Sequence, residues 1–249
     1  MTNLILLSGP SCVGKTTLYH MFCRLYTEKA ENMEKVILYN DRMQRPGEVE
    51  GVDYFFRSRE EVEDLSRQDG YLGIPVRKDL HALELDGIQR ILNGGRHAFY
   101  EGATYVVSAL LRQKIAERIP TKTIFMSPLS RDEILFLRDP ARHVSLPAMM
   151  TDIMRKKQLR RKHKQMDWLS APDLEDIEIR CRAVYAEMLE AHNYEYVIVN
   201  HDGEDSENWT AFPYPVGDAL QSVWDFVSIL DELPRHRVEK WEKDLLPMP

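Results

Sequence analysis

The clearest chemical signal in this chain is a glycine-bearing turn near its start. The turn reads Gly9-Pro-Ser-Cys-Val-Gly-Lys-Thr16 and fits the pattern G-x-x-x-x-G-K-[ST] at every fixed position. The apolar run 3–8 precedes it, and the amphipathic run 17–22 follows it. A strand that leads into such a turn directs backbone N–H groups toward phosphate oxygens at the N-terminus of a helix. The turn therefore predicts a binding site for the phosphates of a nucleoside triphosphate.

The side chains of this turn divide between phosphate and metal binding. Lys15 can reach the β- and γ-phosphates, and the Thr16 hydroxyl can ligate Mg²⁺. We therefore expect ATP and Mg²⁺ as cofactors. A chance match in a surface turn is the alternative, and the strand and helix patterns on either side disfavour it. The residues of the turn that we expect to bind ATP are Ser11, Cys12, Val13, Gly14, Lys15, Thr16 and Thr17.

A second group of phosphate-binding side-chain types follows at residues 41–56. Arg42 and Arg45 stand before a glycine turn, and Tyr54 lies beyond it. Guanidinium groups form paired hydrogen bonds with phosphate oxygens, and a tyrosine hydroxyl adds a further donor. The alternative is that the two arginines form surface ion pairs with Glu48 and Glu50. Taken alone, the pattern favours the surface ion pairs.

Composition and charge restrict the class of protein. The 249 residues, 43% of them hydrophobic, are enough for one large α/β domain or a core with inserted subdomains. With 33 basic and 40 acidic residues the formal net charge is −7, so any contact with nucleic acid must be local. The three cysteines are too few for a disulfide framework, and the first apolar run is too short to span a membrane. These features predict a cytoplasmic protein without a membrane partner.

Short apolar runs alternate with longer helical patterns along the chain. The runs read as buried parallel strands, which predicts a three-layer α/β fold with a parallel central sheet. Helices are expected at 106–118, 177–191 and 218–233, and the charged residues that follow are expected to form a peripheral tail. The expected strands lie at 3–8, 36–39, 98–100, 123–126 and 196–199.

The segment 139–172 departs from this alternation and has little to bury, so we expect it to lie over the surface and to move. Within it, the run 155–164 carries seven Lys or Arg side chains. Such a run is often only a solvated helix face. It could also close over the triphosphate, or follow the backbone of a nucleic acid with an affinity that falls steeply with salt.

The second group of residues, taken with the first turn, resembles guanylate kinase. The resemblance rests on Arg-x-x-Arg-x-Gly-Glu-x-x-Gly-x-Asp-Tyr-x-Phe at 42–56, which follows a Gly-Pro-Ser-x-Val-Gly-Lys-Thr loop. It continues at the turn 127–130 and at 186–200, and it covers most of residues 3–200. The resemblance implies a P-loop kinase fold with an inserted acceptor-binding subdomain and an enlarged helical lid. The implied boundaries are 1–37 for the core with the phosphate loop, 38–97 for the acceptor-binding subdomain, 98–138 for the core, 139–176 for the lid, and 177–249 for the core with a C-terminal extension.

The resemblance also implies roles for single residues. Arg42, Arg45 and Tyr54 would hold the phosphate of an acceptor monophosphate, and Glu101 would contact the metal's water shell or the acceptor sugar. Asn200 would lie on the adenine side of ATP. The residues implied to be catalytic are Lys15, Arg45, Arg180 as a lid arginine, and a second lid arginine for which Arg142 is our assignment among Arg138, Arg142, Arg160 and Arg161.

The positions that would read guanine differ from the family pattern. They are occupied here by Leu38, Gly73 and the neighbourhood of Leu83, so the resemblance implies an altered base pocket. The leading hypothesis is a kinase that transfers the γ-phosphoryl of ATP to a nucleoside monophosphate. A second hypothesis is a kinase of a hydroxymethylated base within DNA, gripped by the basic run 155–164. A third is a non-catalytic interaction module, against which the intact phosphate loop argues.

Overall fold

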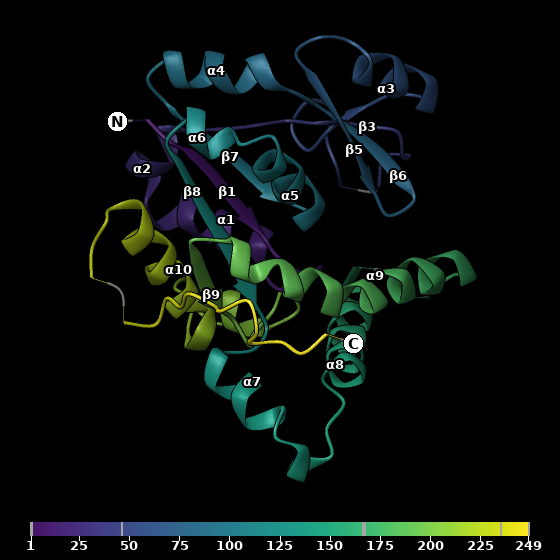
Figure 1. The fold of residues 1–249 in the computed structure, drawn as a ribbon, viewed down its shortest axis with the longest axis vertical. Coiled ribbons are helices and arrows are strands. Elements are labelled where there is room, and N and C mark those ends of the chain that lie inside the picture. Colours follow the sequence, from purple (N-terminus) through teal and green to yellow (C-terminus); the bar gives the residue numbers. More distant parts are fainter. Residues whose placement is uncertain (1, 46, 166–167, 235, 249) are drawn as a thin grey trace. The chain divides into compact units, whose positions relative to one another are not determined.

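A parallel sheet forms the centre of the fold. The computed structural model describes residues 2–45, 47–165, 168–234 and 236–248. Within these residues five strands form one sheet in the order β2-β7-β1-β8-β9 (Figure 1). The pairings of β2 with β7 and of β8 with β9 are parallel, which confirms the α/β class expected from the sequence. The strands are β1 (Leu4–Ser8), β2 (Met33–Lys35), β7 (His97–Gly102), β8 (Thr121–Ser127) and β9 (Tyr196–Val199).

Most of the apolar runs became strands of this sheet. Every residue of β1 is buried, as expected for a parallel strand covered on both faces. The runs at 98–100, 123–126 and 196–199 lie in β7, β8 and β9. The single strand predicted at 36–39 was wrong. Strand β2 ends at Lys35 and Tyr39 begins a strand of another sheet, so this run passes between two sheets.

The contacts divide the chain into two compact units, each of which we describe by itself. The first unit comprises residues 1–6 and 28–122, and the second comprises residues 7–27 and 123–249. The first contains a sheet in the order β4-β3-β6-β5, in which β5 and β6 form an antiparallel hairpin. Its strands are β3 (Tyr39–Asn40), β4 (Phe55–Phe56), β5 (Tyr71–Val76) and β6 (Asp79–Glu84).

One helix of the first unit begins at a clear sequence signal. Helix α3 (Arg59–Ser66) starts with a capping box in which Ser58 and Glu61 each bind the other's backbone N–H. Its Val62 packs on Leu80 and Ala82 of β6. The further helices that lie wholly within this unit are α4 (Leu85–Asn93), α5 (Thr104–Arg112) and α6 (Ile115–Arg118).

The helix predicted at 106–118 is interrupted. Lys114 has a φ of 56°, in the left-handed region, and it separates α5 from α6. A helix cannot continue through such a residue, because each helical residue needs a negative φ. The apolar periodicity of this stretch was correct, whereas the prediction of one continuous helix was wrong.

The second unit contains the helices that flank the phosphate loop. Helix α1 packs against α10, with the rings of Phe22 and Phe226 edge to face at 5.1 Å between centroids. A short helix α2 (Thr27–Glu31) follows α1, and 3₁₀ turns occur at Pro140–Arg142, Glu190–Asn193 and Glu207–Trp209. The long helices of the unit are α1 (Lys15–Leu25), α7 (Arg131–Leu137), α8 (Leu146–Gln165), α9 (Ala171–Leu189) and α10 (Gly217–Leu230).

The segment 139–172 is more ordered than the sequence suggested. Most of it is the 20-residue helix α8, which packs against α9 (Figure 1). Met150, Met154 and Gln158 are fully buried and recur every four residues, so they form one stripe. The prediction of a surface segment with little to bury was wrong, because the apolar stripe continues into the basic run.

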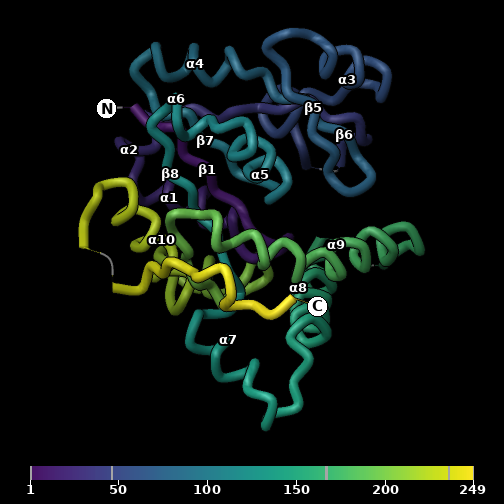
Figure 2. Tube along the Cα trace, viewed as in Figure 1, coloured from purple at the N-terminus to yellow at the C-terminus, as the bar shows by residue number. Residues whose placement is uncertain are grey.

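The C-terminal residues are also packed, so the prediction of a peripheral tail was wrong. Trp241, Leu245 and Leu246 are buried, in the segment drawn in yellow in Figure 2. Glu239 pairs its backbone with Val197 of β9 in both directions, at 2.8 and 2.9 Å. This segment therefore covers the edge of the sheet.

We expect Trp241 to contribute strongly to stability. Its side chain is 3% exposed and packs near Phe125, so Trp241→Ala should lower the free energy of unfolding by about 3–5 kcal/mol. Trp168, which is 81% exposed, is the matched control, and Trp168→Ala should change this free energy by less than about 0.5 kcal/mol. Urea unfolding of both variants measures the difference. Equal losses would show that the C-terminal segment does not pack as described.

Candidate functional site

Two glycines shape the phosphate loop between β1 and α1. Gly9 has a φ of 147°, and a Cβ at this position would lie 2.3 Å from the carbonyl oxygen of Met126. Gly14 precedes α1 with a φ of 105°, and a Cβ there would lie 2.6 Å from Nδ2 of Asn200. A side chain at either position would collide with β8 or with the residue after β9.

Lys15 is folded back over the loop in this structure. Its Nζ donates hydrogen bonds to the carbonyl oxygens of Gly9 and Pro10, both at 2.9 Å. The hydroxyl of Thr17 donates to the carbonyl oxygen of Gly14 at 2.9 Å. The ammonium group therefore lies at the loop itself, where a bound phosphate would meet it.

The segment after β9 lies directly against the loop. Nδ2 of Asn200 donates to the carbonyl oxygen of Val13 at 2.8 Å. The backbone N–H of Glu204 donates to the carbonyl oxygen of Cys12 at 3.0 Å. A Cβ on Gly14 would lie 3.2 Å from the ring of Trp209. The resemblance had indicated Asn200, whereas Glu204 and Trp209 were missed because nothing in their local sequence refers to the loop.

Cys12 is a structural residue of the loop. It adopts a φ of 70°, which costs a residue with a side chain about 1–2 kcal/mol. Burial raises the pKa of its thiol to about 12, although the nearby Arg161 cation opposes this shift. The thiol is therefore protonated at neutral pH and is a poor nucleophile, as expected for a small tolerated side chain.

Arg180 lies beside the phosphate loop. Its Nη1 lies 3.4 Å from the Oγ of Ser11, and its Nη2 forms an ion pair with Asp176 at 2.8 Å on the same helix, α9. The side chain is 11% exposed. An arginine in this position can reach a phosphate bound in the loop.

The four candidates for a second lid arginine lie in different surroundings. Arg161 pairs with Glu204 at 2.7 Å, next to the loop. Arg142 stacks on the ring of Phe136, with its Cζ 3.2 Å from the ring centroid. Arg138 donates to the backbone carbonyls of residues 244 and 245, and Arg160 is 72% exposed. Arg161 is therefore the one whose described contacts place it at the loop.

The basic run on α8 is paired with acidic side chains of the same unit. Lys157 also donates to the carbonyl oxygen of His201. The run is therefore not a simple solvated face, because among the described residues five of its seven cations have an acidic partner within the unit. The pairs are Arg155 with Glu178, Arg160 with Asp205, Arg161 with Glu204, Lys162 with Asp173, and Lys164 with Glu207.

The second candidate site lies in the first unit, around Arg42. The guanidinium of Arg42 forms a two-pronged ion pair with Glu48, at 2.7 and 2.5 Å, and its Cζ lies 5.2 Å from the ring centroid of Tyr54. The backbone N–H of Arg45 donates to the same carboxylate at 2.8 Å. The Arg42 side chain is only 12% exposed, so this is not a surface ion pair.

Glu50 does not bind either arginine of the motif in its described contacts. It accepts hydrogen bonds from Arg57 at 2.7 Å and from the backbone N–H of Phe56 at 2.9 Å. Of the two carboxylates in the surface-pair alternative, Glu48 does pair with Arg42, although in a partly buried site. Glu48 orients the Arg42 fork within a partly buried site, whereas Glu50 belongs to another contact.

Tyr54 and Glu101 are both suited to a polar ligand. Burial raises the pKa of Tyr54, although the Arg42 cation opposes this shift, so the phenol is protonated and can donate a hydrogen bond. The side chain of Glu101 at the end of β7 is 7% exposed and lies 3.9 Å from Lys35. Both side chains belong to the first unit, as Arg42 and Arg45 do.

Two buried polar residues of this unit were missed by the sequence analysis. Asn40 of β3 and His81 of β6 pair directly across the antiparallel sheet, and the His81 ring lies 5.5 Å from that of Tyr54. Among the described residues, Nδ2 of Asn40 and Nδ1 of His81 have no hydrogen-bond partner. Burial, assisted by the Arg42 cation, lowers the pKa of His81 to about 4, so this ring is neutral at pH 7. Only the strand pairing brings the two residues together.

The positions expected to read a base are apolar or lack a side chain. Leu38 and Leu83 are each 1% exposed. A Cβ on Gly73 would lie 2.6 Å from Ser66, so this position has no room for an acidic side chain. The side chains at these three positions therefore offer no hydrogen-bond acceptor.

The donor set suits a metal ion that arrives with a nucleotide. Within the described residues, no group of three His, Cys, Asp or Glu side chains could hold a metal ion. Mg²⁺ commonly takes one or two protein oxygens and completes its shell with phosphates and water, and the Thr16 hydroxyl fits that pattern. No helix of the described chain combines the length and the apolar character needed to cross a bilayer.

Comparison with known proteins relates this geometry to one family. The family model described as guanylate kinase matches residues 1–139. The guanylate kinases of Chlamydia muridarum and Streptococcus pneumoniae (strain R6) are 35% and 37% identical, over 54% and 53% of this chain. These matches span 62% and 60% of the relatives' own length. The guanylate kinase of Chlamydia abortus is 29% identical over 82% of this chain and 83% of its own length.

A solved structure shows the same fold over most of the chain. The crystal structure of guanylate kinase from Anaplasma phagocytophilum superposes with a TM-score of 0.55 at 18% identity. The superposition covers 93% of this chain and 85% of the other. The family model, which matches more than half of the residues, is decisive, and the chain belongs to the guanylate kinase family.

Proposed function

We propose that this protein is a nucleotide kinase that transfers the γ-phosphoryl group of ATP to a nucleoside monophosphate. The observation that carries the proposal is the phosphate loop, whose glycines, carbonyl contacts and Lys15 ammonium are arranged to receive an anion. Family membership supports the same activity. Little covalent chemistry is needed, since positioning and charge stabilisation supply most of the rate in phosphoryl transfer.

The donor half of the reaction belongs to the second unit. Backbone N–H groups of residues 11–17 and the Lys15 ammonium would bind the phosphates, and Asn200 would border the adenine side. The Thr16 hydroxyl would hold Mg²⁺, which supplies charge neutralisation at the β- and γ-phosphates when bound. Arg180 beside Ser11 would stabilise the charge on the transferred group.

We further propose Arg161, in place of Arg142, as the second lid arginine. Arg161 has its described ion pair with Glu204, whose backbone N–H binds the phosphate loop at Cys12. The described contact of Arg142 is with Phe136 instead. We retain residues 139–176 as the lid in this proposal, because α8 carries Arg161 and packs against α9, which carries Arg180.

The acceptor half belongs to the first unit, in the proposed subdomain 38–97 together with Glu101 of β7. Arg42, Arg45 and Tyr54 would bind the acceptor phosphate, with Glu48 keeping the Arg42 fork in place. Glu101 would contact the acceptor sugar or the water shell of the metal ion. A preorganised arginine fork needs little side-chain ordering when phosphate binds.

Base recognition is proposed to differ from that of guanine. Leu38, Gly73 and Leu83 offer no side-chain acceptors to the N1–H and amino group of guanine. A buried donor without a partner costs about 1–3 kcal/mol, so guanylate should be a poor acceptor. The DNA-kinase hypothesis is tested separately by its own acceptor, because ion pairs such as Arg161 with Glu204 do not by themselves exclude phosphate binding by α8.

A panel of acceptors tests the proposed reaction. ATP with Mg²⁺ should give ADP with at least one nucleoside monophosphate, at a kcat/KM about tenfold or more above that for GMP, from the loss of at least one base contact. ADP release measures the rates, and a hydroxymethylated oligonucleotide is included as an acceptor. Transfer to the oligonucleotide alone would contradict the monophosphate proposal. Failure to bind Mg·ATP in calorimetry would instead indicate a non-catalytic module.

The two lid arginines are distinguished by single substitutions. Arg161→Ala and Arg180→Ala should each lower kcat by about 10²-fold, because each removes a cation from the transferred phosphoryl group. Arg182→Ala is the control, since Arg182 is 76% exposed on the same helix as Arg180. Steady-state kinetics measure all three together with Arg142→Ala. A loss in Arg142→Ala that exceeds the loss in Arg161→Ala would restore Arg142 as the second arginine.

Substitution of an acceptor-binding arginine should weaken the binding of the acceptor and leave the binding of ATP unchanged. Arg45→Ala should raise KM for the acceptor about tenfold or more and leave KM for ATP unchanged, because it removes a charged hydrogen bond to the acceptor phosphate. Arg57→Ala is the control, since Arg57 binds Glu50 in the same unit. Initial rates at varied acceptor and varied ATP give both constants. An unchanged acceptor KM would remove Arg45 from the site.

A further inference from the structure

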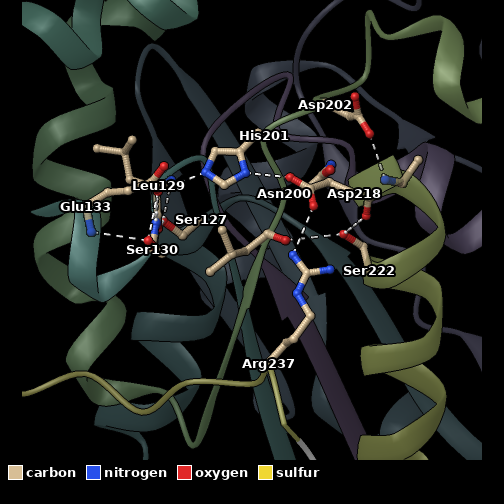
Figure 3. Close-up of polar contacts among 12 residues, drawn as sticks. Ser127, Leu129, Ser130, Glu133, Asn200, His201, Asp202, Asp218, Ser222 and Arg237 are labelled. Carbon is tan, nitrogen blue, oxygen red and sulfur yellow. Dashed lines mark hydrogen bonds and ion pairs between the residues drawn. The ribbon is translucent and has the colours of Figure 1, made fainter. Parts of the chain in front are cut away.

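The imidazole of His201 lies between two carboxylates. Its Nε2 is 2.8 Å from Oε2 of Glu133, and its Nδ1 is 2.5 Å from Oδ2 of Asp218. Figure 3 shows the ring between the first turns of α7 and α10, which carry these two side chains. The residue follows β9 by two positions, so it joins three elements of the second unit.

This geometry fixes the charge of the ring. A carboxylate only accepts hydrogen bonds, and a neutral imidazole carries a proton on one nitrogen alone. Both bonds of His201 can therefore form only when the ring is an imidazolium. If it loses its proton, one nitrogen lone pair faces a carboxylate oxygen, and that side of the contact is repulsive.

The neighbours of His201 hold the phosphate loop and the lid helix. Asn200 donates to the carbonyl oxygen of Val13, and the N–H of Glu204 donates to the carbonyl oxygen of Cys12. On the other side, Lys157 of α8 donates to the backbone carbonyl of His201 itself. The segment 200–205 thus connects the loop to the lid helix, and His201 anchors that segment to α7 and α10.

We propose that protonated His201 is a positioning residue of the donor site. By holding Glu133 and Asp218 together, it fixes the segment 200–205 against the phosphate loop and makes nucleotide affinity depend on its own protonation. The ring itself does not touch the nucleotide. The effect on ATP use rests on the proposed kinase function, whereas the charge state of the ring does not.

Other charged groups around the ring determine the direction of the pH effect. Asp218 also accepts from Arg237 at 2.9 Å, and Asp202 binds the N–H of Ala219 at the start of α10. Because Arg237 partly neutralises Asp218, a neutral ring keeps its proton on the Glu133 side, and the hydrogen bond to Asp218 is the one that is lost.

The sign of the shift follows from these contacts. Burial alone lowers the pKa of His201, but the hydrogen bonds to Glu133 and then Asp218 outweigh it, and the pKa is raised. The stabilisation is therefore complete below the ordinary histidine pKa of about 6.5 and is lost as pH rises through the raised value. We expect nucleotide affinity to fall over the same interval.

Asp218→Asn offers a sharp test, because it changes the charge requirement without removing the contact. Asp218 Oδ1 accepts from Arg237, whereas Oδ2 faces Nδ1 of His201. An asparagine can keep the Arg237 contact with its carbonyl oxygen and donate its amide N–H to a neutral His201, whose Nε2–H still donates to Glu133. This variant should therefore keep its affinity at alkaline pH.

Calorimetric titration with Mg·ATP measures the affinity between about pH 6 and pH 9, on either side of the histidine pKa. The wild-type Kd should rise about three- to tenfold more than that of Asp218→Asn, the loss expected for one partly exposed charged hydrogen bond. His201→Gln should bind weakly at both ends. His20→Gln, a change at an exposed histidine of α1, should behave as the wild type. Parallel pH profiles of wild type and Asp218→Asn would overturn the proposal.

Nitrogen NMR of the histidine rings separates this inference from the kinase proposal. Near pH 7 both ring nitrogens of His201 should carry protons in the protein without nucleotide. A neutral ring under these conditions would refute the inference, whatever the protein binds. A protonated ring in a protein that fails to bind ATP would leave the carboxylate contact intact and refute the kinase function instead.

Discussion

The phosphate loop depends on the hydrogen bonds that its carbonyl groups accept. A loop that turns its N–H groups toward an anion must turn carbonyl oxygens away from it, and buried carbonyls need donors. Here Lys15 binds those of Gly9 and Pro10, while the segment after β9 binds those of residues 12 and 13. The carbonyl groups of the loop are thus bound by Lys15 of the loop itself and by the distant residues Asn200 and Glu204.

The same arrangement explains the charge pattern of a protein that is acidic overall. In the described part of the chain, five of the seven cations in the basic run of α8 pair with acidic residues of segment 202–207 and of α9. A phosphate that engages Arg161 must therefore compete with Glu204. Net charge therefore said little about the site, because the relevant charges are balanced locally.

Sequence reasoning succeeded where a short local pattern carries the physical requirement. The turn 9–16 and the arginine motif could be recognised because glycine is needed at fixed backbone positions and guanidinium groups match phosphate. It failed where burial depends on a partner from elsewhere in the chain. The C-terminal segment looked like a charged tail, yet Trp241 and Leu245 are buried against the second unit. Helix α8 was missed because its buried stripe lies within a basic run.

By itself, the sequence determined the α/β class, the phosphate loop, the arginine pair and the resemblance to a kinase family. Only the tertiary structure decided that Arg161 is the candidate arginine next to the phosphate loop, that Glu48 pairs with Arg42, and that Asn40 faces His81 across two strands. It also placed His201 between Glu133 and Asp218. The reason is physical: a motif encodes backbone geometry over a few neighbouring residues, whereas charge pairing and protonation depend on side chains that only folding brings within hydrogen-bond distance.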